Sequence, residues 1–190
     1  MKLILASGSP RRKELLGAAG FDFTVRTADV AETLPSGVPA RDGVRLLAER
    51  KGAAVRDLIG DDTPILSADT LVELDGEKLG KPKDASDAAR MLRALSGRAH
   101  AVHTGVAVHY KGKTFSDVAT TAVFFRPLTE EEIRAYVESG EPMDKAGAYA
   151  IQGLGGALVE RYDGDLDTVV GLSMRIVNVL LGEALEGADS

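Results

Sequence analysis

Residues 7–12 of this chain, with the sequence SGSPRR, combine hydroxyl and guanidinium groups in one short turn. They follow an apolar run directly, so the pattern predicts a strand that ends in a turn and then a helix. Ser9 is typical of an N-cap, and Pro10 of a first helical residue, where its missing N–H costs nothing. The free N–H groups of that turn, with Arg11 and Arg12, are suited to a phosphate. The alternative is an ordinary capped helix with two solvated arginines.

An aspartate interrupts an otherwise apolar strand pattern at residues 65–72. An unpaired carboxylate in such a strand would cost several kcal/mol, on the order expected for a buried charge, so Asp69 needs a partner. One interpretation is a hydrogen-bonded structural acid. The other is a general base or a metal ligand, because a hydrated divalent ion would stabilise the carboxylate and bring phosphate oxygens to it.

Two further segments carry a cation beside small or rigid residues. Lys81 stands between a glycine and a proline, which fixes its backbone locally, although the same tripeptide also forms plain surface turns. Residues 144–153 (DKAGAYAIQG) combine Lys145 with small residues and with the amide of Gln152. A glutamine offers both a donor and an acceptor to a pyrimidine edge, whereas a carboxylate would only accept.

The three histidines do not predict a zinc site. On a strand, His100 and His103 point to opposite faces, and no acidic third ligand is adjacent to them or to His109. The chain has no cysteine, which excludes disulfides and thiolate zinc ligands. We therefore interpret the histidines as structural.

The hydrophobic patterns predict an α/β fold with a mixed, twisted sheet and flanking helices. Crossover helices and hairpin turns both occur, the hairpins at Asp75-Gly76 and Lys111-Gly112. Thr129 and Glu132 predict a capping box, and Asp42 and Asp84 are acids typical of helix starts. Strands are expected at residues 2–6, 21–26, 64–74, 99–109, 114–125 and 157–162. Helices are expected near residues 10–19, 39–58, 84–95, 129–138 and 172–185. With no linker in sight, we expect one domain over residues 1–190.

Composition limits the partners of the chain. A net charge of −6, an aromatic content of 5% and no tryptophan argue against nucleic-acid binding. No apolar run approaches the roughly 18 residues that span a bilayer, so we expect a cytoplasmic protein without a membrane partner. A small phosphorylated ligand remains compatible with the charge, because a pocket needs only a few local cations.

Six motifs occur in the order and spacing found in the Maf nucleotide pyrophosphatases, and the chain resembles a full-length member. They are residues 7–12, 68–70, 80–82, 103–105, 144–153 and 170–172. The resemblance implies two lobes around a cleft, similar to inosine triphosphate pyrophosphatases. It also implies hydrolysis of nucleoside triphosphates to the monophosphate and pyrophosphate, with a divalent cation such as Mg²⁺ or Mn²⁺.

The same resemblance implies roles for individual residues. Asp69 would accept the proton of the attacking water, and Glu32 would assist it at the metal. Lys51 and Lys81 would neutralise the charge that develops on the phosphates. The substrate phosphates would be bound by Ser7, Arg12 and Lys145.

Three positions resemble the branch of the family that hydrolyses dTTP and UTP. They are Arg11, Thr70 and Gln152, where members directed at 7-methylguanosine triphosphate have tryptophan, glutamine and glutamate. Two departures from the family pattern are Ser173, where proline is usual, and Gly52, where alanine is usual. Neither falls on the expected chemistry, but a glycine costs about 1 kcal/mol relative to alanine inside a helix.

The expected role is house-cleaning of the nucleotide pool, with a link to septum formation and the arrest of cell division. An alternative is a nucleotide-binding regulator of division whose hydrolysis is incidental. A third interpretation is a pyrophosphatase for modified nucleotides. The family resemblance also leaves a homodimer open.

Overall fold

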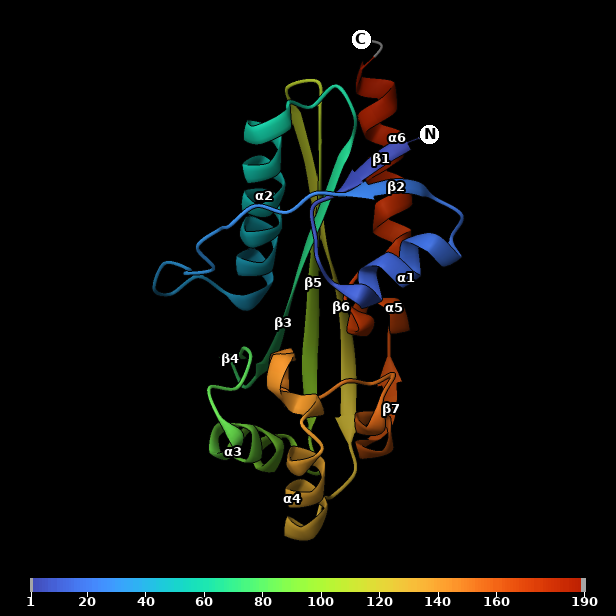
Figure 1. The fold of residues 1–190 in the computed structure, drawn as a ribbon. Coiled ribbons are helices and arrows are strands. Elements are labelled where there is room, and N and C mark those ends of the chain that lie inside the picture. Colours follow the sequence, from blue (N-terminus) through green and yellow to red (C-terminus); the bar gives the residue numbers. More distant parts are fainter. Residues whose placement is uncertain (1, 189–190) are drawn as a thin grey trace. The chain divides into compact units, whose positions relative to one another are not determined.

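The computed structural model describes residues 2–188, which form both strands and helices (Figure 1). The strands are β1 (Lys2–Leu5), β2 (Asp22–Val25), β3 (Ile65–Leu74), β4 (Glu77–Leu79), β5 (Ala99–Tyr110), β6 (Lys113–Phe125) and β7 (Val159–Asp163). The α-helices are α1 (Pro10–Ala18), α2 (Ala40–Ile59), α3 (Ala85–Leu95), α4 (Glu130–Glu138), α5 (Leu166–Val170) and α6 (Met174–Ala188). Three 3₁₀ helices are η1 (Glu141–Asp144), η2 (Ala146–Ala148) and η3 (Leu154–Leu158).

Within the described residues, seven strands form one mixed sheet with the order β2-β1-β3-β5-β6-β7, and β4 pairs with β3. Strand β1 runs parallel to β2 and to β3, whereas the β3–β4 and β6–β7 pairs are antiparallel. Helices flank the strands (Figure 1). The predicted mixed α/β architecture is therefore confirmed.

The chain divides into two compact units that share the long strands β3, β5 and β6. The first unit contains residues 1–69, 104–119 and 171–190, and the second contains residues 70–103 and 120–170. On β3, the division falls between Asp69 and Thr70. The expectation of one domain over the whole chain stays a prediction.

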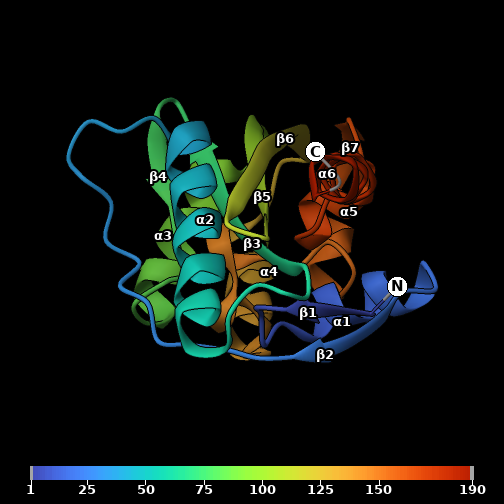
Figure 2. The ribbon, with the colours of Figure 1, turned by 90° about the horizontal axis from the view of Figure 1, so that it is seen from above.

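In the first unit, strand β3 uses its two faces differently. Leu66 and Ala68 are fully buried in the cluster that contains Leu172 and Ile176 at the start of α6 and its preceding turn. The alternate residue Ile65 packs instead with Val55 of α2. Successive side chains of a strand point to opposite faces, so α2 and α6 cover opposite sides of these strands (Figures 1 and 2). Asp69 belongs to the set that faces α2.

The second unit has its own core beneath α3 and α4. Both helices begin with side-chain caps: Asp84 accepts from the Asp87 N–H, and Thr129 and Glu132 form the predicted capping box. Tyr149 and Phe125 meet edge to face within this core, at a centroid separation of 4.8 Å. The core residues of α3 and α4 include Ala88, Met91, Leu92, Leu95, Ile133 and Tyr136.

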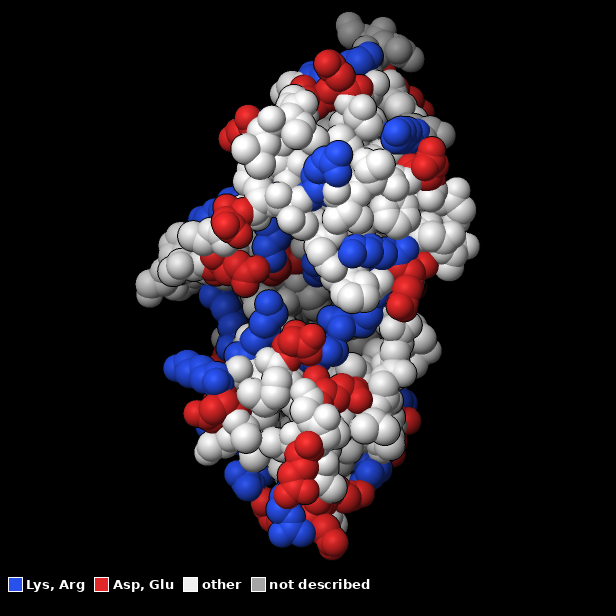
Figure 3. Space-filling model, in the orientation of Figure 1, with Lys and Arg blue, Asp and Glu red and all other residues white. Residues whose placement is uncertain are grey.

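The surface of the second unit carries charges of both signs. Figure 3 shows Lys and Arg side chains beside Asp and Glu side chains on the visible face of this unit. Some of these neighbours form ion pairs: Arg93 lies 2.8 Å from Glu130, and Arg126 lies 2.7 Å from Glu132. Exposed pairs of this kind contribute little to stability, because water screens them. The more buried charged groups are therefore the better candidates for a functional role.

The C-terminal third differs most from the sequence prediction. The strand expected at residues 157–162 begins at Val159, because Leu154–Leu158 form the 3₁₀ helix η3. The 3₁₀ helices and the five-residue α5 were not predicted, since such short elements show no 3.6-residue hydrophobic period. No helix among the described residues combines the length and the apolarity required to cross a membrane.

Candidate active site

A lysine joins two carboxylates in the first unit. Lys51 Nζ donates to Asp69 Oδ1 at 2.5 Å and lies 2.7 Å from Glu32 Oε1. Asp69 is buried, with 8% of its surface exposed, whereas more than half of the Glu32 side chain is exposed. The acid in the apolar strand therefore has a cationic partner, as its burial requires.

Three elements bring this cluster together. Asp69 lies on β3, Lys51 in the middle of α2, and Glu32 in the loop that joins β2 to α2, where the sequence predicts it. Arg50, next to Lys51, donates to the Thr33 carbonyl at 2.8 Å and so attaches this loop to the helix. The helix thus holds both the cation and the segment that carries the second carboxylate.

The turn before α1 holds a second cation. Pro10 begins α1, and Ser9 occupies the N-cap position, but the Ser9 side chain makes no capping bond. Arg12 donates through Nη1 to Ser7 Oγ at 3.0 Å and through Nε to the Gly171 carbonyl at 2.7 Å. The alternative of two solvated arginines is therefore wrong for Arg12.

The electrostatics of Arg12 connect it with the carboxylates of the first unit. Burial lowers the pKa of Arg12, and the negative charge of Asp69 acts in the opposite direction. Arg11 adds to the lowering and Glu32 opposes it. Arg12 therefore lies close enough to both carboxylates and to Arg11 for their charges to affect one another.

In the second unit, a backbone bond joins the two lysine-bearing segments. The Gly147 N–H donates to the Gly80 carbonyl at 3.1 Å, so the turn that carries Lys81 lies against the segment that carries Lys145. The Lys145 ammonium pairs with Asp144. Gly147 has a φ of +69°, and a Cβ there would lie 2.8 Å from Val72 Cγ2, so both conformation and space require glycine.

The loop that carries Gln152 is held by a carboxylate that the sequence did not predict. Glu141 accepts from the Leu154 N–H at 2.9 Å and from the Gly155 N–H at 3.3 Å. A Cβ at Gly153 would come 2.3 Å from the Glu141 carboxylate. Gln152 itself is exposed.

Tyr136 and Glu141 together form a clamp on the Gln152 loop. The Tyr136 hydroxyl donates to Glu141 Oε1 at 3.2 Å and accepts from the Ala150 N–H at 3.1 Å. Burial is the largest cause of a raised Tyr136 pKa, so the hydroxyl stays protonated. Glu141 and Tyr136 lie 13 to 14 residues from the amides they bind. No local spacing in the sequence could have indicated these bonds.

The expected specificity residues are placed in different parts of the chain. Arg11 is half-buried on α1 of the first unit. Thr70 is half-buried on β3, and Gln152 is exposed in its loop, both in the second unit. Their role in choosing a substrate stays a prediction.

The three histidines are all buried and hydrogen-bonded to protein groups, as the structural interpretation requires. His103 contacts Thr120 Oγ1 at 2.8 Å through Nδ1 and Glu73 Oε2 at 3.0 Å through Nε2. Burial lowers the pKa of His100 to about 4 and also lowers the pKa of His109. Both therefore stay neutral at pH 7.

The donor set of the first unit suits a cation that is shared with a substrate. Among residues 2–188, no group of three or more histidine, aspartate or glutamate side chains is arranged to hold a metal ion. Mg²⁺ is commonly bound by one or two carboxylates together with substrate phosphates. Asp69 and Glu32, two carboxylates that already converge on one cation, fit that chemistry.

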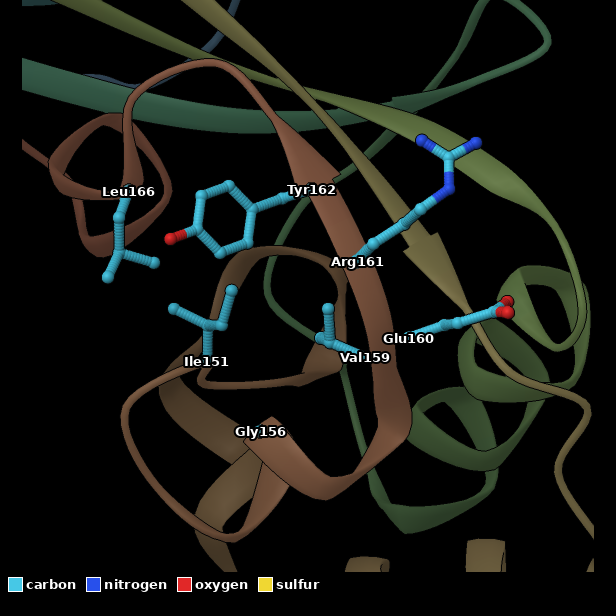
Figure 4. Close-up of a pocket in the computed structure, with 7 residues that line it drawn as sticks. All are labelled: Ile151, Gly156, Val159, Glu160, Arg161, Tyr162 and Leu166. Carbon is cyan, nitrogen blue, oxygen red and sulfur yellow. The ribbon is translucent and has the colours of Figure 1, made fainter.

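A separate pocket of about 440 Å³ lies in the second unit. Figure 4 shows Tyr162, Ile151 and Leu166 converging on it, while the Glu160 and Arg161 head groups point away. The guanidinium carbon of Arg161 lies 3.4 Å from the centre of the Phe124 ring. The predicted site residues do not line this pocket, so it is distinct from the charge clusters described above.

Comparison with known sequences gives matches along most of the chain. A family model described as "Maf-like protein" matches residues 2–184. A protein named "dTTP/UTP pyrophosphatase" from Desulfitobacterium hafniense is 50% identical, over 92% of this chain and 82% of the relative. One of the same name from Thermus thermophilus is 52% identical, over 94% of this chain and 92% of the relative.

Comparison with solved structures concerns the fold alone. The Staphylococcus aureus Ham1 protein is 15% identical with a TM-score of 0.51, covering 100% of both chains. A HAM1 protein from Coxiella burnetii is also 15% identical with a TM-score of 0.51, covering 97% of this chain and 100% of that one. The chain thus shares its α/β architecture with structures of low sequence identity.

Proposed function

The chain belongs to the Maf family, and on this premise we propose that it hydrolyses dTTP and UTP to the nucleoside monophosphate and pyrophosphate. The observation that carries the proposal is the extent of the match: relatives that bear the name dTTP/UTP pyrophosphatase are about half identical over more than nine tenths of the chain. The Lys51–Asp69–Glu32 cluster supplies groups suited to that reaction.

In the proposed reaction, Asp69 takes a proton from a water molecule while the oxygen of that water bonds to the α-phosphorus. The bond between the α-phosphorus and the bridging oxygen breaks, and pyrophosphate leaves with that oxygen. Lys51, already in contact with Asp69, stabilises the negative charge that develops on the phosphate oxygens. Such a reaction depends on positioning and charge more than on covalent chemistry of the protein.

Other cations of the chain bind the substrate phosphates in this proposal. In the first unit, Arg12 has a fixed guanidinium plane because Ser7 and Gly171 hold it. A fixed guanidinium suits phosphate oxygens well, since two parallel N–H bonds match their geometry. In the second unit, we assign the same role to Lys81 and Lys145.

We also propose that the reaction uses Mg²⁺ or Mn²⁺, with Asp69 and Glu32 as the protein ligands. A divalent cation bound there would supply positive charge opposite the triphosphate oxygens. The two carboxylates would then hold the cation with Lys51 as a neighbour. Chelation by EDTA should abolish turnover, and added Mg²⁺ or Mn²⁺ should restore it.

For the choice of base, we propose that Gln152 binds a pyrimidine edge, with Arg11 and Thr70 as further specificity residues. The exposed Gln152 amide offers one donor and one acceptor group. A glutamate at this position would suit a cationic methylated purine instead. The bonds to the Ala150 and Leu154 amides, on either side of Gln152, support this role, because they fix the loop from which the Gln152 side chain extends.

The test measures pyrophosphate release from dTTP, UTP, CTP, GTP and 7-methylguanosine triphosphate with Mg²⁺ or Mn²⁺. We expect release from dTTP and UTP, and a loss of at least about 10²-fold in Asp69→Asn, as for removal of a general base. Release mainly from the methylated purine would overturn the specificity assignment. Tight nucleotide binding without release would overturn the enzymatic proposal in favour of a nucleotide-binding regulator.

In the cell, we propose that the chain limits the pool of pyrimidine triphosphates and that any effect on septum formation follows from hydrolysis. Overproduction in a bacterial host should then lower dTTP and UTP, whereas overproduction of Asp69→Asn should not. A division defect that persists with Asp69→Asn would contradict this role. Comparison of damaged with ordinary pyrimidine triphosphates tests whether modified nucleotides are better substrates.

A further inference from the structure

Gly52 follows Lys51 directly and lies in the interior of α2. Glycine is less favourable than alanine inside a helix, and no unusual φ requires it here. Space does require it: a Cβ at Gly52 would lie 2.3 Å from His109 Cδ2 and 2.7 Å from Ser67 Oγ. The backbone of α2 therefore touches these two side chains directly at the residue next to the proposed catalytic lysine.

The two side chains that fill this space both bind carbonyls of α2. Ser67 Oγ donates to the Ala48 carbonyl at 2.7 Å. His109 Nε2 lies 3.0 Å from the Glu49 carbonyl, and since a carbonyl only accepts, Nε2 carries the proton. His109 Nδ1 then accepts from the Thr114 hydroxyl at 2.9 Å. The histidine is thus fixed at both ring nitrogens.

The spacing of these contacts aligns the helix with the strand. Ser67 and Asp69 are two residues apart on β3 and share its α2-facing side. Their partners on the helix, Ala48 and Lys51, are three residues apart and share one helical face. The strand therefore holds the helix at two consecutive points, of which the second is the Lys51–Asp69 contact.

We propose that Gly52, His109 and Ser67 are positioning residues for Lys51. Together they set how closely α2 approaches β3 and where along the strand it packs. They thereby keep Lys51 Nζ between Asp69 and Glu32. The inference rests on the proposed function for its kinetic consequences. None of the three positioning residues is assigned a contact with substrate.

The first test is Gly52→Ala, assayed on dTTP. The new Cβ forces α2 or His109 to move, and we expect kcat to fall by about ten- to a hundred-fold, the scale of an ångström-level misplacement. KM should change less than threefold, because the phosphate-binding groups are elsewhere. Gly182→Ala in α6 is the matched control, since a Cβ there meets no atom within 4 Å. An unchanged kcat in Gly52→Ala would overturn the proposal.

Two double variants separate positioning from general damage. With Lys51→Met in place, adding Gly52→Ala should lower kcat no further, because the group being positioned is gone. A further tenfold fall would show that Gly52 acts through something else. His109→Ala removes the ring atoms that lie closest to the new Cβ, so adding Gly52→Ala to His109→Ala should lower kcat by less than threefold relative to His109→Ala alone. A further fall of tenfold or more would contradict the role of His109.

A structural readout keeps the inference separate from the proposed function. If the wild-type chain releases no pyrophosphate, the proposed function is wrong. Crystal structures of Gly52→Ala and Gly182→Ala then test the positioning role without an activity assay. The Lys51 Nζ–Asp69 Oδ1 contact should open in the first and persist in the second. If Gly52→Ala does not fold, Ser67→Ala removes one bond to α2 without adding bulk. It should then show the same opening or a severalfold loss of kcat, and an intact contact with normal kcat would overturn the proposal.

Discussion

The two units hold their proposed functional side chains in different ways. In the first unit, the charged groups bind each other: Lys51 contacts both Asp69 and Glu32. In the second unit, Gln152 is left exposed, and two other side chains, Glu141 and Tyr136, bind the backbone around it. The first arrangement fixes charges, and the second fixes the shape of a loop.

Because of this difference, we expect substitutions in the two units to change different kinetic constants. Charges fixed against each other serve a step in which charge develops, so changes in the first unit should act mainly on kcat. A loop fixed by its backbone serves recognition, so changes around Gln152 should act mainly on KM and on substrate choice. Variants that reverse this pattern would show that the comparison is wrong.

The largest expected effect belongs to Lys51. Replacement by methionine in Lys51→Met keeps most of the side-chain volume and removes the charge, and kcat on dTTP should fall by about 10²- to 10³-fold, as for removal of a transition-state donor. Lys111→Met, in the exposed turn between β5 and β6, is the control and should leave kcat unchanged. A Lys51→Met enzyme with raised KM and normal kcat would place this lysine in substrate binding instead.

The buried residue His100 in the second unit provides a test that does not depend on activity. His100 Nε2 shares a 2.7 Å hydrogen bond with Tyr149, but within the described residues His100 Nδ1 has no partner. Burial lowers the pKa of His100 from 6.5 to about 4. Protonation of the folded protein would leave a buried charge without an acceptor.

The sign of the resulting pH effect follows from linkage. Between pH 6.5 and 4, the unfolded chain binds a proton at His100 that the folded chain does not, so stability falls as the pH falls. Since a tenfold change in proton affinity is worth about 1.4 kcal/mol, the loss attributable to His100 approaches about 3 kcal/mol near pH 4. Urea unfolding across this range should show a smaller loss for His100→Gln. Equal losses in both proteins would contradict the assignment.

The sequence predicted those features that depend on neighbouring residues. The capping box of Thr129 and Glu132, the start of α1 at Pro10 and the turns at Asp75 and Lys111 all rest on local backbone preferences, and all are present. Local signals are short-range and survive in most tertiary contexts. The main helices and strands were predicted from hydrophobic patterns, which also depend on residues near one another in the sequence.

What the sequence could not give depends on contacts between distant residues. An acid in an apolar strand predicted that Asp69 needs a partner, and family resemblance pointed to Lys51 and Glu32, but the contact itself joins three separate elements. The contact of Gly52 with His109 spans 57 positions, and no periodicity records it. From the sequence, Gly52 was only a residue that costs about 1 kcal/mol relative to alanine inside a helix, with no indication of this neighbour.

A smaller effect should follow from loosening the clamp in the second unit. Glu141→Gln keeps the shape of the side chain but weakens its bonds to the Leu154 and Gly155 amides, because bonds to a charged acceptor are the stronger ones. KM for dTTP should rise by about tenfold, in line with a loss of about 1.4 kcal/mol, while kcat stays within twofold. Exposed Glu138 on α4 supplies the matched control, Glu138→Gln. A fall in kcat with an unchanged KM would remove the distinction between the units.

The smallest effect contrasts the N-caps of α1 and α4. The Thr129 hydroxyl accepts from the Glu132 N–H at 3.2 Å, whereas the Ser9 side chain makes no capping bond. Thr129→Ala should therefore lower the free energy of unfolding by about 1 kcal/mol, and Ser9→Ala should lower it clearly less. Urea unfolding measures both. If Ser9→Ala is as destabilising as Thr129→Ala, Ser9 caps its helix in solution, and the contrast between the two helix starts is wrong.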